Sequence, residues 1–223
     1  MSFYLKKCIF LQAEKEGTML IIGIAGGSGS GKTTVVKKII RSLPENTVSL
    51  ISQDAYYKDQ GHLSDEAKKN INFDHPESIE FALLNKHIDK LKTGQAIEMP
   101  TYDYASCSRG EKTIRIEPRK VIIVEGILIF TDPLLRDNLD IKVFVSADSD
   151  DRLMRIMKRD VEERGRTYDD VLTHYSKYVK IGHREFIAPT KRFADIIIPE
   201  GGNNHVGIEI LTSRILKKLR DNI

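Results

Sequence analysis

Residues 26–33 read Gly26-Gly27-Ser28-Gly29-Ser30-Gly31-Lys32-Thr33, and they decide the fold. They follow an apolar run at 20–25 and precede a pattern typical of a helix that begins near Thr33. The spacing G-x-x-x-x-G-K-T between a strand and a helix predicts a loop whose backbone N–H groups surround phosphate oxygens. In such a loop Lys32 reaches the terminal phosphates and Thr33 ligates Mg²⁺. The alternative is a glycine-rich turn without a ligand, which the flanking strand and helix disfavour.

Apolar runs on both sides of this loop predict the rest of the architecture. Strand candidates lie at 20–25, 48–51, 121–124, 142–145 and 194–199, and helical patterns lie at 33–43, 77–91 and from about 206 onward. Five strands that alternate with helices predict an α/β fold, a parallel sheet covered by helices on both faces. Two short alternating segments, 97–104 and 113–116, predict a small β-hairpin lobe.

The composition limits the classes of protein to consider. The chain has 223 residues, 40% of them hydrophobic and 30% charged, with a net charge of +3, which suits one large domain and no dedicated nucleic-acid binder. Cys8 and Cys107 match no zinc or redox spacing, and no run approaches the length of a membrane span, so we expect a cytoplasmic protein with no membrane partner. We expect a single domain over 19–223, with residues 1–18 an extension outside the fold.

Two acidic residues follow predicted strands. Asp54 comes directly after the second strand, and because open α/β sheets bind ligands at the carboxyl ends of their strands, we expect it to point toward the nucleotide. Glu125 ends the buried strand 121–124. An acid in that position is typical of residues that hold Mg²⁺ or its water, although an acid that caps a helix remains the alternative.

A basic segment lies between Asp151 and Arg166. On a helix, Arg152, Arg155 and Arg159 share one face by their three- and four-residue spacing. One interpretation is a solvated amphipathic helix balanced by neighbouring acids. The other is a lid, spanning about 150–185, that brings arginines onto a transferring phosphoryl group and excludes water. The phosphate-binding loop elsewhere in the chain favours the lid.

Several motifs stand in a single order along the chain. They are the loop at 26–33, Gln53-Asp54-Ala55-Tyr56-Tyr57, Asn72-Phe73-Asp74-His75-Pro76, Tyr102-Asp103-Tyr104, Glu125-Gly126-Ile127-Leu128, Arg159-Asp160 with Glu163-Arg164-Gly165-Arg166, and Pro189-Thr190-Lys191-Arg192 with Ala194-Asp195. From about Met19 to the C-terminus the chain resembles the uridine–cytidine kinase family of P-loop kinases. The resemblance implies a P-loop kinase fold whose insertion at about 61–118 binds the substrate.

The resemblance also implies an activity: transfer of a phosphoryl group from ATP or GTP, with Mg²⁺, to the 5′-hydroxyl of uridine or cytidine in pyrimidine salvage. It implies that Asp54 is the general base and that Asp74 binds the ribose hydroxyls. The remaining implied positions are Gly26, Gly27, Ser28, Gly29, Ser30, Gly31, Lys32, Thr33 and Thr34 for the donor; Thr33 and Glu125 for the metal; Lys32, Arg159 and Arg164 for catalysis; and Tyr57, Tyr102, Tyr104, Cys107, Arg166 and His174 for the acceptor. A homotetramer restrained by pyrimidine triphosphates is implied as well.

Three positions depart from the family pattern, all on the acceptor side. Cys107 stands where many members have a histidine at the pyrimidine edge, Ile156 where many have an arginine near the ribose, and His174 where others have a glutamine. Phosphoryl transfer is therefore better supported than the identity of the nucleoside.

Two other functions compete with a nucleoside kinase. A kinase for another acceptor, phosphoribulokinase-like or pantothenate-kinase-like, would keep the fold, but the tyrosines around Tyr102 favour a flat base over a sugar phosphate or an acyclic acid. A GTPase-type switch usually carries D-x-x-G after a strand, and no glycine in this sequence has an aspartate three residues before it.

Overall fold

The structure is a computed structural model that describes residues 19–68 and 70–221. The predicted extension at 1–18 lies outside the described residues. Within the part of the chain that is described, no helix is long and apolar enough to cross a membrane.

A five-stranded parallel sheet forms the centre of the molecule, as predicted. Its strands are β1 (Leu20–Ala25), β2 (Val48–Ser52), β5 (Val121–Gly126), β6 (Ile141–Ser146) and β7 (Ile196–Pro199), in the spatial order β2-β5-β1-β6-β7. Every neighbouring pair is parallel. The carboxyl ends of β1, β2 and β5 therefore meet at one edge, where open parallel sheets bind ligands.

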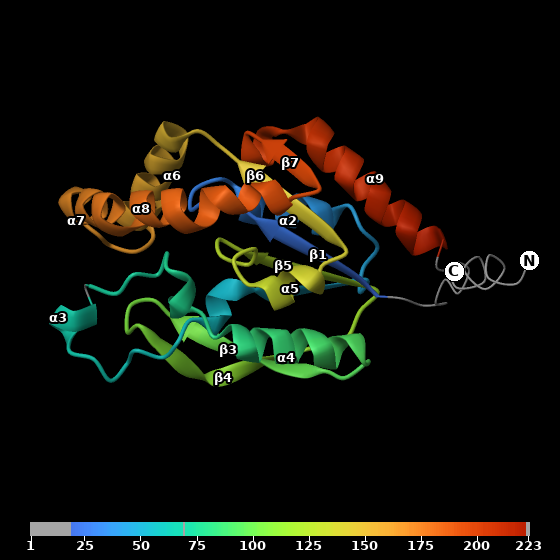
Figure 1. Cartoon of the computed structure of the whole chain (residues 1–223), viewed down its shortest axis with the longest axis horizontal. Helices are drawn as coiled ribbons and strands as arrows, with labels where there is room; N and C mark the ends of the chain where they lie inside the picture. Colours follow the sequence, from blue (N-terminus) through green and yellow to red (C-terminus); the bar gives the residue numbers. More distant parts are fainter. Residues whose placement is uncertain (1–18, 69, 222–223) are drawn as a thin grey trace, which may run out of the picture.

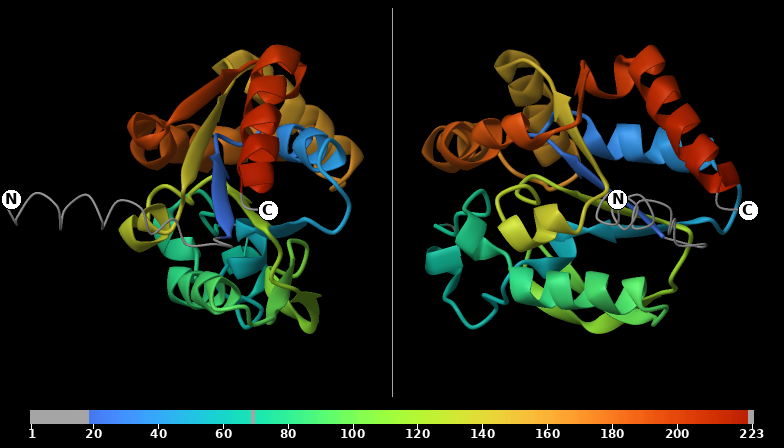
Figure 2. Two further views of the ribbon diagram at one scale, coloured as in Figure 1. Left: turned by 90° about the vertical axis from the view of Figure 1, so that its right-hand side faces the viewer. Right: turned by 45° about the vertical axis from the view of Figure 1, so that its right-hand side comes forward.

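Helices cover both faces of this sheet (Figures 1 and 2). The helices α2 (Lys32–Arg41) and α9 (His205–Asp221) pack on one face, and α4 (Phe81–Lys92) and α5 (Pro133–Asp137) pack on the other. Strand β1 shows why both faces are apolar: Ile22 and Ile24 enter the core with α2 and α9, whereas Ile21 and Ala25 enter the core with α4. Successive side chains of a strand point to opposite faces, so a central strand is apolar throughout.

The predicted hairpin lobe is also present. Strands β3 (Ile97–Asp103) and β4 (Ser108–Ile116) pair antiparallel in a separate two-stranded sheet, and β3 contributes Ile97 and Met99 to the core that α4 fills. The short helix α3 (Asp65–Lys68) lies in the same insertion. Figure 1 shows the hairpin and α4 together, on the far side of the sheet from α9.

A second helical region follows β6. It consists of α6 (Ser149–Glu162), α7 (Tyr168–His174), a π-helical turn (Tyr175–Val179), α8 (Lys180–Gly182), a second π-helical turn (His183–Ile187) and a 3-10 segment (Ala188–Phe193). Ile156, Val171, Tyr175 and Val179 form a small core of their own. This region contains the residues that the sequence assigns to a lid.

The helix predicted from Glu77 begins four residues late, at Phe81. Residues Pro76–Ser78 form a 3-10 turn instead, and Ile79 is bridged to Tyr57 in an antiparallel pair. This bridge holds the backbone of Ile79 extended, while its side chain is buried in the core. Ile79 therefore fits the apolar spacing of the helix in the sequence because it is buried, although it does not belong to the helix.

Candidate active site

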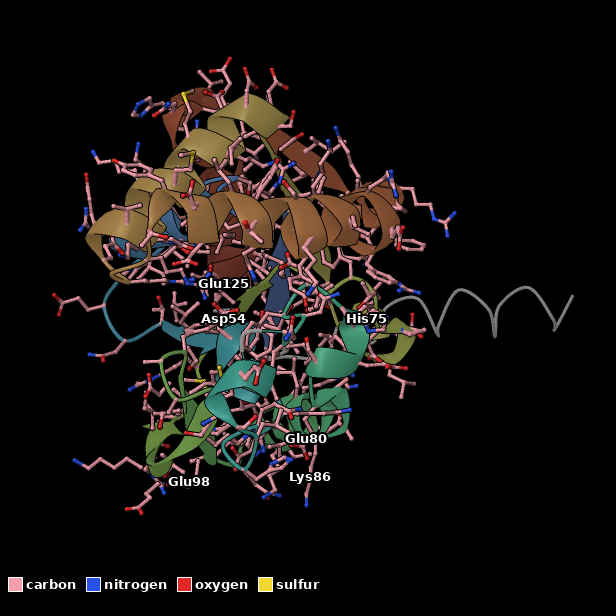
Figure 3. All side chains as sticks on the ribbon, turned by 90° about the vertical axis from the view of Figure 1, so that its left-hand side faces the viewer. Asp54, His75, Glu80, Lys86, Glu98 and Glu125 are labelled. Atoms are coloured by element: carbon pink, nitrogen blue, oxygen red, sulfur yellow. The ribbon has the colours of Figure 1, made fainter. Side chains whose placement is uncertain are left out.

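A cavity of about 310 Å³ opens at the carboxyl edge of the sheet. It brings together residues from the phosphate-binding loop, from the segment after β2, from the insertion and from the helical region after β6. Its lining comprises Ser28, Gly29, Gly31, Lys32, Thr33, Thr34, Ser52, Asp54, Tyr57, Phe73, Asp74, Tyr104, Glu125, Gly126, Ile127, Arg155, Ile156, Arg159, Asp160, Arg164, Arg166, His174 and Val179. Figure 3 shows Asp54 and Glu125 close together, as the pairing of Ser52 with Glu125 between β2 and β5 requires.

The phosphate-binding loop runs from β1 into the N-terminus of α2. Gly31, the residue before the helix, has φ of 90°, a left-handed conformation that suits glycine. Gly26, Gly27 and Ser30 are not among the described residues that line the cavity, because they form the side of the loop that faces the protein. The loop thus presents Ser28, Gly29 and Gly31, together with the first turn of α2, to the cavity.

Lys32 lies in the middle of the charged groups of the site. Its ammonium donates to the Gly27 carbonyl at 3.2 Å. Burial lowers the pKa of Lys32, and the nearby carboxylates of Glu125 and Asp54 oppose that shift. A buried cation beside two carboxylates is suited to meet an anionic ligand that enters the cavity.

Thr33 and Glu125, the two residues expected to hold a metal ion, contact each other. The Thr33 hydroxyl donates to Glu125 Oε2 at 3.3 Å, so two hard oxygen ligands lie side by side at the mouth of the loop. No group of three or more His, Cys, Asp or Glu side chains within 19–68 and 70–221 is arranged to hold a metal. The pair fits Mg²⁺, which typically takes one or two protein oxygens and completes its shell with substrate phosphates and water.

Asp54 lines the cavity from the 3-10 turn Gln53–Tyr56 that follows β2. Tyr104 is a neighbour of Asp54. Burial raises the pKa of the Tyr104 phenol, and the Asp54 carboxylate raises it further. Tyr104 is therefore neutral and can donate to a carboxylate. Gln53, fully buried, accepts a hydrogen bond from the Leu128 N–H at 2.7 Å, which fixes the turn that carries Asp54 against the end of β5.

Asp74 is one of two deeply buried carboxyl groups of the cavity, with 3% of the residue exposed, the same fraction as Asp160. Its Oδ1 accepts no hydrogen bond from the described part of the chain. Burial raises the pKa of Asp74 to about 6, although the Lys32 charge opposes the shift. An unsatisfied buried carboxylate oxygen costs stability, which a ligand hydroxyl would recover.

Four aromatic rings form one cluster beside Asp74. Tyr57 contacts Phe73, Tyr102 and Tyr104 with ring centroids 5.0, 5.4 and 5.8 Å apart, and the Tyr57 hydroxyl donates to the Phe73 carbonyl at 3.2 Å. Edge-to-face contacts of this kind fix the orientation of the rings. Tyr57, Phe73 and Tyr104 line the cavity as an aromatic wall, and Tyr102 packs against all three rings.

Two residues assigned to the acceptor do not line the cavity. Among the described residues that line the cavity, neither Tyr102 nor Cys107 appears. Cys107 is buried, has φ of 53° and donates from Sγ to the Tyr104 carbonyl at 3.5 Å. Its contacts support the turn of the hairpin and, through it, the backbone of Tyr104.

The arginines of α6 do not all play the part that their spacing predicts. Arg152 is 4% exposed and donates to the Ser28 carbonyl at 3.5 Å. Arg155 donates to the Gly29 carbonyl at 3.2 Å. Both arginines therefore bind carbonyl oxygens of the phosphate-binding loop, a role that sequence spacing cannot reveal because the loop lies more than 100 residues away.

Arg159, Arg164 and Arg166 lie at the cavity with Asp160. His174 lines the same side. Burial lowers the pKa of His174 to about 4, and the Arg166 charge adds to the shift, so the imidazole is neutral near pH 7. Ile156, which is 3% exposed, adds an apolar side chain to the same side of the cavity.

Sequence reasoning missed several cavity residues. Phe73 and Ile127 lie within quoted motifs but were assigned no role in the site, and Val179 is an ordinary apolar residue outside every motif. Gly182 was missed too: a Cβ there would lie 2.6 Å from Asp74 Cβ and 2.8 Å from the Asp74 carbonyl oxygen, so glycine lets the helix pack directly on the Asp74 backbone.

Solved structures share this fold at low sequence identity. D-glycerate 3-kinase from Cryptococcus neoformans var. grubii matches 82% of this chain and 87% of its own, with a TM-score of 0.62 and 16% identity. A structure described as that of a possible uridine kinase from Bacillus stearothermophilus matches 87% of this chain and 95% of its own, with a TM-score of 0.55 and 20% identity. Both confirm the α/β kinase fold.

Sequence relatives are much closer. Uridine kinase of Oceanobacillus iheyensis is 51% identical over 200 residues, which cover 90% of this chain and 95% of the relative. Uridine kinase of Clostridium perfringens is 48% identical over 200 residues, 90% of this chain and 96% of the relative. The model of the Phosphoribulokinase / Uridine kinase family matches residues 21–207. The chain therefore belongs to the phosphoribulokinase/uridine kinase family, and it is a kinase that transfers phosphate to a hydroxyl group.

Proposed function

We propose that this kinase phosphorylates the 5′-hydroxyl of uridine or cytidine, with ATP or GTP as donor, to give UMP or CMP. The observation that carries the proposal is the pairing of Asp54 and Asp74 in one cavity with an aromatic wall and the phosphate-binding loop. In the proposed reaction Asp54 accepts a proton, Asp74 binds sugar hydroxyls, and the aromatic wall suits a flat base. The uridine kinases to which the chain is about half identical support the same acceptor.

Each end of the cavity has a distinct part in the proposed reaction. The loop at 26–34, with Lys32, binds the triphosphate. When bound, Mg²⁺ would be held by Thr33 and Glu125 and would neutralise charge on the donor phosphates. Asp54 accepts the proton of the 5′-hydroxyl and aligns it for in-line attack.

Residues at the other end of the cavity orient the acceptor. Asp74 accepts hydrogen bonds from the ribose 2′- and 3′-hydroxyls, which its unsatisfied Oδ1 allows. Tyr57 and Tyr104 contact the base, and His174, as a neutral imidazole, offers one donor and one acceptor to its edge. Arg159, Arg164 and Arg166 stabilise negative charge on the transferred group, and the helical region 150–185 acts as the lid that carries them.

Several further properties belong to the same proposal. A role in pyrimidine salvage, a cytoplasmic location with access to nucleoside triphosphates, a homotetramer and restraint by pyrimidine triphosphates all accompany this activity. In the same way, Cys107 and Tyr102 are proposed to act on the acceptor indirectly, by supporting Tyr104 and Tyr57.

A coupled assay that detects ADP tests the acceptor. The protein is mixed with ATP, Mg²⁺ and one acceptor from a panel of uridine, cytidine, their deoxy forms, ribulose 5-phosphate and pantothenate. We expect turnover with uridine or cytidine and none above background with the last two. Turnover with a sugar phosphate or pantothenate alone would contradict the proposal and favour the other branch of the family.

A further inference from the structure

A single buried carboxylate pairs with three of the arginines that line the cavity. Asp160, near the end of α6, has a side chain only 4% exposed. Arg159 Nε lies 2.8 Å from its Oδ1, Arg164 NH1 lies 3.4 Å from the same oxygen, and Arg166 NH1 lies 3.6 Å from Oδ2. Both oxygens of one carboxylate therefore orient guanidinium groups from three positions of the chain.

The backbone is built around the same residue. The Arg166 N–H donates to the Asp160 carbonyl at 3.0 Å, which closes the loop 160–166 on itself. Gly165 has φ of 64°, the left-handed conformation that lets the chain turn back at this point. Arg164 and Arg166 consequently return to the same side of α6 as Arg159.

The charges at this cluster do not balance. Asp160 faces three guanidinium groups, so it neutralises about a third of their charge. Each guanidinium carries five N–H donors in a planar fork, and one carboxylate uses a few of them. Arg164 also lies over the Tyr104 ring, 4.7 Å from its centroid, which keeps it directed across the cavity.

We propose that Asp160 is the positioning residue of the phosphoryl-transfer step, which holds Arg159, Arg164 and Arg166 where they meet the transferred group. It acts through the arginines and does not itself touch the substrate. Without its charge, three cations that converge within about 4 Å of one point repel one another and separate. The inference rests on the proposed function, because it assigns the arginines to the transferred phosphoryl group.

The test replaces Asp160 with Asn, which keeps the shape and removes the charge. Positioning errors of about 1 Å cost roughly a hundredfold in rate, so we expect kcat for uridine and ATP to fall at least about tenfold. The KM values for both substrates should change by less than about threefold, since the arginines act mainly on the transition state. The matched control is Asp151→Asn on the same helix. Asp151 pairs with Arg155 at 3.9 Å and is half exposed, and its kcat should stay within about twofold of the parent.

A double-mutant cycle separates positioning from a merely structural role. If Asp160 works through Arg164, then Asp160→Asn combined with Arg164→Gln should lose little more kcat than the worse single variant, because residues that act as one unit are not additive. Losses that add, or a kcat for Asp160→Asn within about twofold of the parent, would overturn the proposal.

A second variant keeps the proposal testable if Asp160→Asn folds poorly. Asp160→Glu keeps the charge and moves it by one methylene; we expect it to melt near the parent's Tm and to lose at least about threefold in kcat. Parent-like kcat in this variant would overturn the proposal. A parent protein that phosphorylates no nucleoside would instead refute the proposed function, so the two failures are distinguishable.

Discussion

Acceptor binding should weaken as pH falls through the titration of Asp74. The pKa of this buried carboxyl is raised to about 6, and only the ionised form accepts hydrogen bonds at both oxygens. With that pKa, about 90% of Asp74 is ionised near pH 7 and about 10% near pH 5. If the ionised form alone binds the ribose hydroxyls, the Kd for uridine should be roughly tenfold higher near pH 5 than near pH 7.

The other charged groups near Asp74 must also be considered between pH 5 and pH 7. Burial lowers the pKa of Lys32 and the pKa of Arg152, and the nearby Asp74 carboxylate opposes both shifts. Burial lowers the pKa of His174 and of His183 to about 4, so both imidazoles are mainly neutral across the range. Burial also raises the pKa of Glu125, whose carboxylate accepts a hydrogen bond from Thr33.

Isothermal titration calorimetry with uridine, in the presence of a non-hydrolysable donor and Mg²⁺, measures the effect directly. Near-UV circular dichroism at both pH values checks that the protein stays folded. Asp74→Asn is the control: it should bind uridine weakly and with a Kd ratio close to one. A parent Kd that agrees within about twofold at the two pH values would refute the role of Asp74, because ionisation would then leave binding unchanged.

Three further variants test other parts of the site. Asp54→Asn should lower kcat by orders of magnitude while the Kd for the donor stays near the parent's; unchanged kcat in initial-rate assays would remove Asp54 as the base. Glu125→Gln should raise the Mg²⁺ concentration for half-maximal rate about tenfold, and a parent-like Mg²⁺ titration would exclude it as a ligand. Gly182→Ala forces a Cβ against the Asp74 backbone, so the KM for uridine should rise with the donor KM unchanged; equal changes in both would point to a global effect.

The sequence predicts the features that are local. The phosphate-binding loop has a fixed spacing between a strand and a helix, and the five strands are short apolar runs, so each can be recognised without knowing its neighbours. The hairpin at 97–116 follows from alternation on either side of a polar turn. The start of α4 was predicted wrongly because Ile79 is held by Tyr57, a residue 22 positions away.

Side-chain partners are the part that the sequence leaves open. Arg152, Arg155 and Arg159 were correctly expected to share a face of α6, but the spacing alone cannot say that Arg152 and Arg155 hold Ser28 and Gly29. These contacts depend on how α6 packs on the sheet. The same holds for Cys107, whose place in a turn depends on a backbone conformation, φ of 53°, that no sequence motif announces.

The most direct test of the proposed function is the identity of the product. The protein is incubated with uridine, ATP and Mg²⁺, ADP is measured, and the phosphorylated nucleoside is analysed by ³¹P and ¹H NMR. The roles proposed for Asp54 and Asp74 predict one UMP per ADP with the phosphate on the 5′-oxygen. ADP release that does not depend on the nucleoside, or phosphate at the 2′- or 3′-oxygen, would contradict it.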